Sequence, residues 1–205
     1  MASTNVRCLH TDSLLPAFPP VRGEADEATI RAAASQVASG VAVATWGIGE
    51  ARGGLTTASV SPLQAEPATL VVTFNRASSA YAAFARANRF AVNVLGGDQR
   101  EIAEHFSGLS EAANAGPFEV GRWVPLSDGL CCLADCAAVF ECEAEETIGW
   151  RTGAIVIARV RRAFIGGGSG ALVRWRGAYD QLGWSRDEIC RAVGLAPGGR
   201  AWGEV

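Results

Sequence analysis

The middle of the chain alternates between short runs of apolar or β-branched residues and glycine-rich or polar turns. Such runs favour strands, because branched and aromatic side chains pack well on a pleated, half-buried surface. The pattern predicts strands over residues 41–46, 55–60, 68–74, 90–95, 136–147, 153–165 and 171–176, the last being the final strand of the chain.

Helical spacing of apolar residues is confined to a few short segments. Residues 24–39, with Ile30 and Val37 on one face, predict a helix, and so do residues 78–88. Residues 98–106 predict a helix that Asp98 caps, and residues 185–193 predict a terminal helix with a capping box. Strands outnumber helices without regular alternation, which predicts a mainly β protein: an antiparallel sheet or barrel with peripheral helices.

Length and composition indicate one globular domain. The chain has 205 residues, of which 49% are hydrophobic and 19% charged. We expect a flexible N-terminal arm over residues 1–23, the domain over 24–184, and a C-terminal helix and tail over 185–205. The absence of a long apolar run or a signal-peptide core leads us to expect a cytoplasmic protein.

The charge pattern excludes several functions. The formal net charge is −3, so no positive field favours nucleic acid. All 18 basic residues are arginine. Without lysine the chain can form neither a pyridoxal Schiff base nor a Walker-type phosphate loop.

Two candidate sites are set aside on the sequence alone. Gly47 and Gly49 follow a strand, but β-prone residues come next where a dinucleotide fingerprint needs a helix, so we expect a hairpin loop. Four cysteines cluster over residues 131–142 without a C-x-x-C pair. We therefore expect buried thiols and no metal site.

Two further segments carry candidate ligand-binding groups. The first has four hydroxyls in six residues, which either form an exposed strand face or bind a polar ligand; these are Thr56, Thr57, Ser59 and Ser61. The second, Asn75-Arg76-Ala77-Ser78-Ser79, ends a strand and opens a helix. Helix N-termini and arginines bind phosphate, so this is either an anion site or an ordinary cap with a solvated arginine.

Taken in order, these segments resemble the flavin reductase-like family over about residues 30–182. The resemblance rests on residues 39–45, 54–61, Pro67, 70–76 with Ser78 and Ser79, 90–95, 98–107 and 172–179. It implies a split β-barrel homodimer that binds FMN or FAD at the subunit interface. It also implies NAD(P)H as the hydride donor and a partner monooxygenase that receives the reduced flavin.

The resemblance also assigns site residues. It places the flavin ring and ribityl chain beside Thr45, Thr56, Thr57, Ala58 and Ser59, and the phosphate beside Asn75, Arg76, Ser78 and Ser79. No catalytic acid or base is expected, because hydride passes directly from nicotinamide to flavin when the two rings are stacked.

The chain departs from the family pattern at two places. Arg151-Thr152-Gly153 stands where the family often has Gly-Asp-His, and Ala80 replaces a threonine after the phosphate-loop serines. Two alternatives therefore stay open. One is a flavin-binding protein of the same fold without reductase turnover, and the other is a flavoenzyme that acts on its own organic substrate.

Overall fold

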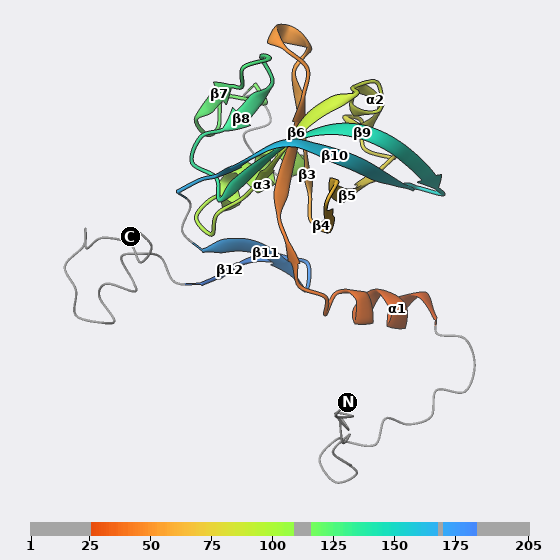
Figure 1. Ribbon diagram of the computed structural model, residues 1–205. Coiled ribbons are helices and arrows are strands. Elements are labelled where there is room, and N and C mark those ends of the chain that lie inside the picture. The colour runs from red at the N-terminus through yellow and green to blue at the C-terminus, as the bar shows by residue number, and fades with distance from the viewer. Residues whose placement is uncertain (1–25, 109–115, 168–169, 184–205) are drawn as a thin grey trace, which may run out of the picture.

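A computed structural model describes residues 26–108, 116–167 and 170–183 as a mainly antiparallel β structure with short helices (Figure 1). The largest sheet has seven strands in the order β3-β2-β6-β9-β10-β5-β4. Its members are β2 (Ala42–Trp46), β3 (Gly53–Thr57), β4 (Val60–Ala65), β5 (Ala68–Asn75), β6 (Arg89–Val94), β9 (Ala138–Trp150) and β10 (Gly153–Ile165). The predicted fold class, mainly antiparallel β with peripheral helices, is confirmed.

The smaller elements surround this sheet. One three-stranded sheet has the order β1-β11-β12, and a two-stranded sheet pairs β7 with β8. Their bounds, with those of the helices, are β1 (Ser39–Gly40), β7 (Trp123–Pro125), β8 (Cys131–Leu133), β11 (Ala171–Trp175), β12 (Ala178–Leu182), α1 (Glu27–Ala34), η1 (Gly49–Ala51), α2 (Tyr81–Phe84) and α3 (Arg100–Ser107). No helix within these described ranges is long and apolar enough to span a bilayer.

The connection between β3 and β4 forces the large sheet to curl. These two strands are the opposite edges of the sheet, yet only Ala58 and Ser59 separate them in sequence. Three Cα–Cα steps span at most about 11 Å, so the two edges must meet at this end. The Thr57 hydroxyl donates to the Thr73 carbonyl of β5 at 2.8 Å, and the Thr73 amide donates to the Ser59 carbonyl at 3.0 Å. We call this junction of β3, β4 and β5 the seam.

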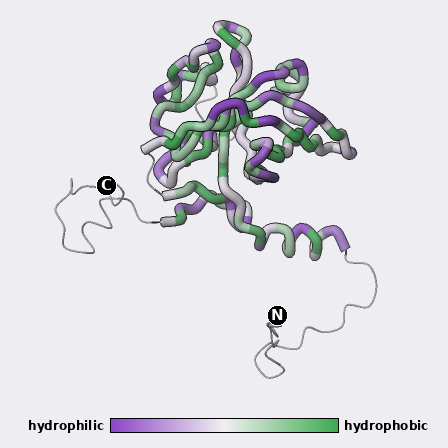
Figure 2. Tube along the Cα trace, in the orientation of Figure 1, coloured by the Kyte–Doolittle hydropathy of each residue, from purple (hydrophilic) through white to green (hydrophobic). Residues whose placement is uncertain are grey.

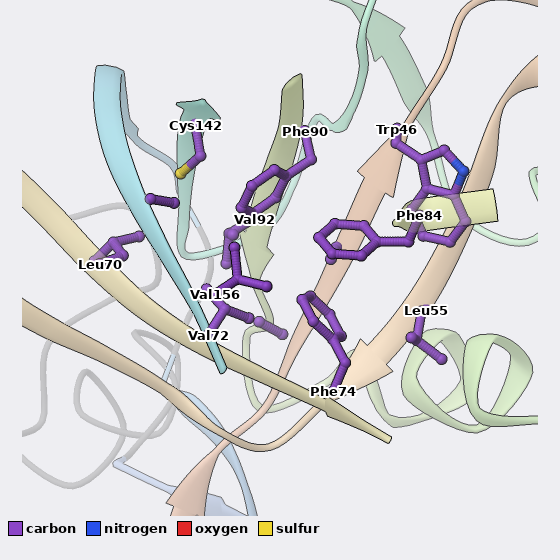
Figure 3. Close-up of a cluster of buried hydrophobic side chains, with 13 residues drawn as sticks. Trp46, Leu55, Leu70, Val72, Phe74, Phe84, Phe90, Val92, Cys142 and Val156 are labelled. Atoms are coloured by element: carbon purple, nitrogen blue, oxygen red, sulfur yellow. The ribbon is translucent and has the colours of Figure 1, made fainter. Parts of the chain in front are cut away.

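An aromatic cluster fills one face of the curled sheet (Figure 3). Phe84 of α2 is 3% exposed and lies against Phe74 and Phe90, with ring centroids 4.3 and 5.2 Å away. Trp46 meets the same ring edge-on at 5.5 Å. The short helix α2 therefore carries the side chain around which the core aromatics assemble.

A second apolar cluster covers the other face of β2. Val41 and Val43 pack there with Ile102 and Phe106 of α3 and with Leu172 of β11. Because both faces of β2 are covered, all five of its residues are buried, and its sequence is a continuous apolar run interrupted by Thr45 alone. Figure 2 colours the described chain by hydropathy and shows short hydrophobic and hydrophilic stretches alternating along the trace.

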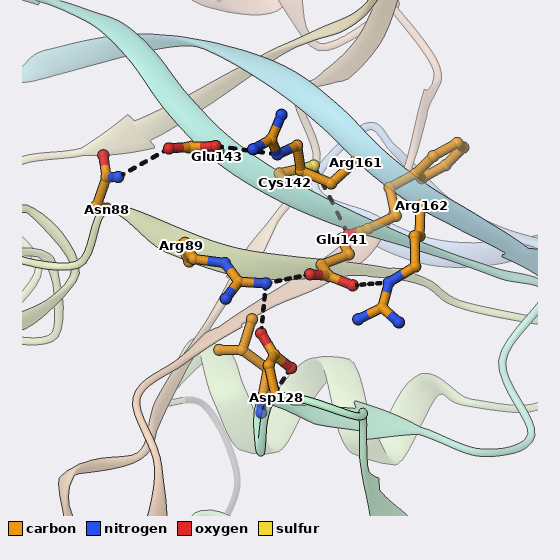
Figure 4. A network of polar contacts seen from close by, with 10 residues as sticks. Asn88, Arg89, Asp128, Glu141, Cys142, Glu143, Arg161 and Arg162 are labelled. Atoms are coloured by element: carbon orange, nitrogen blue, oxygen red, sulfur yellow. Dashed lines mark hydrogen bonds and ion pairs between the residues drawn. The ribbon is translucent and has the colours of Figure 1, made fainter.

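A buried carboxylate joins β6, β9 and β10 (Figure 4). Glu141 is 1% exposed and forms ion pairs with Arg89 and Arg162, and Arg89 also contacts Asp128. The hydrogen bond to Glu141 raises the pKa of the Arg162 guanidinium. Since a buried charge is costly without partners, the two arginines make this position of the carboxylate possible.

The helix α1 projects from the body of the molecule (Figure 1). None of its residues is buried, and Ile30 is 57% exposed although it lies on the predicted apolar face. What fastens its C-terminal end is Arg176, whose amide donates to the Ser35 carbonyl and whose Nε donates to Gln36 Oε1, both at 2.9 Å.

Several predicted boundaries were wrong. The predicted strand 55–60 is two strands, because the chain turns at the seam. The predicted helix 78–88 shortens to α2, and α3 begins after Gln99, so Asp98 is not its cap. A strand, β12, follows the one expected to be last, and neither β7 nor β8 was predicted. The arm over 1–23 and the helix over 185–193 lie outside the described residues.

Replacing the central aromatic tests this account of the core. We expect Phe84→Ala to lower the free energy of unfolding by about 3–5 kcal/mol, because the cavity would lie among four other aromatic rings. The control is Ile165→Ala, whose side chain is 96% exposed and whose loss should cost less than about 0.5 kcal/mol. Urea unfolding followed by tryptophan fluorescence measures both. Equal effects would show that Phe84 does not anchor the core.

Candidate functional site

A groove of about 490 Å³ opens along the seam. We call it the seam groove. Its walls are Leu55, Thr56, Thr57, Ala58, Ser59, Thr73, Phe74, Asn75, Thr152, Gly153 and Arg174. The groove thus joins the hydroxyl-rich segment after β3, the end of β5 and the turn between β9 and β10. Five of the predicted site residues lie together here: Thr56, Thr57, Ala58, Ser59 and Asn75.

The threonine hydroxyls of the groove hold the fold in place. The Thr56 hydroxyl donates to the Ala103 carbonyl of α3 at 2.8 Å, and the Thr57 hydroxyl accepts from the Ser59 amide at 3.2 Å while it donates across the seam. Both hydroxyls therefore donate their hydrogen bond within the protein and not to a ligand. What the segment offers is a rigid wall with a small side chain at Ala58 and an exposed one at Ser59.

The second predicted segment forms a turn at the border of the groove. Asn75 Oδ1 accepts from the Ala77 amide at 3.0 Å, and the Asn75 carbonyl accepts from the Ser78 amide at 3.1 Å. The Arg76 amide donates to the Thr152 carbonyl at 2.7 Å, while its guanidinium lies 3.4 Å from the Arg151 carbonyl. This fixes the turn against the β9–β10 hairpin.

The expected helix terminus behind this turn was wrong. The helix α2 starts at Tyr81, has four residues and has no side-chain cap, so Ser78 does not cap it. Arg76, Ser78 and Ser79 lie beside the groove and are not among its walls. Any anion binding there would use the exposed guanidinium of Arg76 and the polar groups of the turn, because a four-residue helix offers little dipole.

Thr45 lies away from the groove. Its side chain is fully buried, donates to the Cys131 carbonyl at 2.6 Å and accepts from Asn93 Nδ2 at 3.2 Å. These bonds tie β2 to β8 and β6. The structure therefore gives Thr45 a place in the packing of the sheet and no surface toward a ligand in the seam groove.

A family model described as "Flavin reductase like domain" matches residues 34–183. The chain belongs to the flavin reductase-like family. Among its relatives, an FMN reductase (NADH), RutF, of Bradyrhizobium diazoefficiens is 31% identical over 64% of this chain and 72% of that protein. A second, FMN reductase (NADH) RutF 1 of Methylorubrum extorquens, is 37% identical over 57% of each chain.

A solved structure shares the fold. The styrene monooxygenase flavin reductase (SMOB) of Pseudomonas putida is 24% identical, with a TM-score of 0.64 over 75% of this chain and 97% of that one. The family match extends through β11 and β12, since it ends at residue 183. The strand expected to be last is therefore followed by one more strand within the flavin reductase-like domain.

Arg174 and Thr152 are groove residues that sequence reasoning missed. Arg174 is on β11, whose pairing with β1 sets Arg174 opposite Ser39, 135 positions earlier in the chain. Thr152 lies in the turn between β9 and β10, at one of the places where the sequence departs from the expected family pattern. The departure at residues 151–153 was visible in the sequence, but nothing there indicated that Arg174 would reach the same groove.

A separate hollow of about 340 Å³ is a rival site. Its walls are Tyr81, Phe84, Ala85, Arg86, Ala87, Asn88, Ala144, Glu145, Glu146 and Thr147. It contains none of the residues that the family resemblance assigns, and two carboxylates lie in its wall. Its carboxylates, Glu145 and Glu146, outnumber its one arginine, Arg86, so it suits a phosphorylated ligand less well than the seam groove, which we favour as the functional site.

The clustered cysteines are buried thiols, as expected. Cys132, Cys136 and Cys142 are buried, and Cys131 is half-buried, all four being free. Burial raises the pKa of the Cys136 thiol to about 11 and that of the Cys142 thiol to about 12. Both stay protonated near neutral pH and are poor nucleophiles and metal ligands. Across residues 26–108, 116–167 and 170–183, no three His, Cys, Asp or Glu side chains form a metal-binding group.

Proposed function

We propose that this chain is an NAD(P)H-dependent flavin reductase that transfers hydride to FMN or FAD and supplies reduced flavin to a partner monooxygenase. One observation carries the proposal: the seam groove joins the Thr56–Ser59 segment to Asn75 in a chain of the flavin reductase-like family. The names of the RutF relatives and of the styrene monooxygenase reductase support the activity and the kind of partner.

The groove suits a flavin. Its volume of about 490 Å³ lies within the ~300–1,000 Å³ of typical ligand sites. Its walls combine apolar surface from Leu55 and Phe74 with polar groups around Ser59 and Asn75, as a flat ring with a polar chain requires. Ala58 leaves room for a ring to approach the backbone closely.

The protein's part in the reaction is to position the two rings and to exclude water from them. Bound flavin would supply the hydride acceptor, and the nicotinamide the hydride. The bonded hydroxyls of Thr56 and Thr57 keep one wall rigid, and Phe74 and Leu55 exclude water behind it. No side chain of the groove needs to move a proton, since hydride transfer between stacked rings depends on their alignment.

The hairpin side of the groove favours a second candidate function. Thr152 and Gly153 line it where the family often has a histidine near the nicotinamide. A flavin-binding protein without turnover, or a flavoenzyme with its own organic substrate, would tolerate that replacement. The reductase remains our proposal because neither alternative accounts better for the rest of the groove.

A homodimer and a cytoplasmic location complete the proposal. Ile148 and Ile155 face each other across β9 and β10 and are 43% and 37% exposed, and Trp150 near them is 71% exposed. Such an apolar group on one hairpin suits contact with a second copy. The free thiols fit a reducing compartment.

The dimer is tested by light scattering of the purified protein at micromolar concentration. We expect twice the mass of the chain, and Trp150→Ser with Ile148→Ser should shift the protein toward the monomer, since the interface would lose its apolar centre. The control is Phe164→Ser, which replaces a side chain of comparable exposure near the other end of β10. A wild-type monomer with flavin present would contradict the proposal.

Turnover is tested by mixing the protein with NADH and FMN and following the nicotinamide absorbance band. We expect the band to disappear catalytically, at many equivalents per protein, with FMN or FAD as acceptor. NADPH in a parallel reaction identifies the preferred donor. Tight flavin binding without NAD(P)H oxidation would instead support the flavin-binding alternative.

Arg76 is the residue we propose for the flavin phosphate. A charged hydrogen bond to phosphate is worth about 1.5–3 kcal/mol, so Arg76→Ala should weaken FMN binding roughly 10- to 100-fold. Riboflavin, which lacks the phosphate, should bind nearly as before, and Arg76→Lys should recover part of the loss. Fluorescence titration measures all of these.

The structure adds a specific alternative outcome for Arg76. Its guanidinium also contacts the Arg151 carbonyl and lies against Gly149. If Arg76→Ala weakened FMN and riboflavin equally, the side chain would support the hairpin wall of the groove and not the phosphate. If neither affinity changed, the Arg76 side chain would be exposed to solvent without contributing to flavin binding.

A further inference from the structure

A second, smaller hollow adjoins the seam groove. It measures about 160 Å³ and lies between α1 and the β11–β12 hairpin, and we call it the helix hollow. Its walls are Ala34, Ser35, Val37, Ser39, Ala58, Arg174, Arg176 and Gly177. Ala58 and Arg174 belong to both walls, so a ligand could extend from the groove into the hollow past these two side chains.

The charge in these two hollows has one sign. Arg174 is the one charged residue among those lining the seam groove, and Arg174 and Arg176 are the two in the helix hollow. Neither wall contains a carboxylate. Two positive groups without an acid between them favour an anion, and a guanidinium fork fits phosphate oxygens in particular.

Arg174 differs from the arginines of β10, the strand that precedes β11 in the chain. Arg159, Arg161 and Arg162 of β10 each form an ion pair with a glutamate of β9. Within the described part of the chain, no carboxylate lies at ion-pair distance from Arg174; its guanidinium lies 5.9 Å from the centre of the Tyr179 ring. Its donors are thus available to a ligand.

The backbone around Arg174 is fixed in advance. The pairing of β1 with β11 sets its register, and Arg176 fastens α1 through the bonds to Ser35 and Gln36 while its guanidinium stacks on Trp175 at 4.5 Å. Arg176 therefore acts as a positioning residue for the helix wall, and Arg174 is the arginine that lines both the groove and the hollow.

We propose that Arg174 binds the phosphate of the adenylate half of a dinucleotide whose flavin or nicotinamide ring lies in the seam groove. This rests on the proposed function. The helix hollow is smaller than the ~300 Å³ of a small ligand site, so it takes a part of a ligand, such as a phosphate, and not a second ring system. We have proposed Arg76 for the flavin phosphate, and in a flavin dinucleotide the adenylate phosphate shares a bridging oxygen with it. The two phosphates would therefore lie side by side in the groove that Asn75 and Arg174 both line.

The test compares flavins that lack the adenylate half, riboflavin and FMN, with the dinucleotides FAD and NADH that contain it. Wild type and Arg174→Ala are titrated with riboflavin, FMN and FAD by flavin fluorescence without NADH, and the KM for NADH is then measured with saturating FMN. We expect Arg174→Ala to weaken FAD binding or to raise the KM for NADH about 10- to 100-fold, with FMN and riboflavin changed by less than about twofold. A change in FAD affinity would identify FAD as the dinucleotide, and a change in the KM for NADH would identify NADH.

Two matched variants sharpen the result. Arg174→Lys keeps the charge without the fork and should recover part of the loss. Arg100→Ala on α3, whose side chain is 62% exposed, removes the same charge elsewhere and should leave all constants unchanged. The salt dependence of the affected constant should also become less steep in Arg174→Ala, as one ionic contact is lost.

Three outcomes would overturn the proposal. The first is no change in FAD affinity or in the KM for NADH. The second is an equal loss for FMN and FAD with riboflavin unchanged, which would make Arg174 the ligand of the mononucleotide phosphate. The third is an equal loss for all three flavins, which would give Arg174 a part in the fold, the ring site or a subunit contact. A wild type that binds flavins without oxidising NADH would refute the reductase function, while the FAD and FMN titrations would still test Arg174.

Discussion

The two-residue step from β3 to β4 constrains the rest of the molecule. It requires the two edges of a seven-stranded sheet to meet, and so it curls the sheet and creates an interior that large side chains must fill. Phe84 and its aromatic neighbours fill it. The same step leaves an irregular junction where β3, β4 and β5 meet, and the seam groove lies along that junction.

The junction explains why hydroxyl-bearing residues gather there. Where regular strand pairing stops, backbone groups need other partners. The hydroxyl of Thr57 supplies one across the seam, to the Thr73 carbonyl, and the hydroxyl of Thr56 joins β3 to the Ala103 carbonyl of α3. The hydroxyls of Thr56 and Thr57, which the sequence suggested as ligand-binding groups, therefore form hydrogen bonds within the protein. The segment's contribution to a ligand is a rigid surface, on which Ala58 permits a close approach.

The sequence predicted the parts of this structure that depend on local pattern. The spacing of apolar residues correctly located most strands of the large sheet. The order of the Thr56–Ser59 and Asn75–Ser79 segments suggested the family. The misses depend on contacts between distant segments. Nothing in the sequence near Arg174 reveals that it lies opposite Ser39. Thr45 matches a ligand position of the family resemblance, but its hydroxyl bonds to β8, a strand that the sequence pattern did not predict.

The most direct test of the central claim is a crystal structure of the protein with FMN. The account predicts the flavin ring in the seam groove, against the backbone of residues 57–59 and bordered by Asn75 and Thr152, with Thr45 out of contact. A ring bound instead in the hollow beside Tyr81 and Glu145, with the seam groove empty, would contradict it.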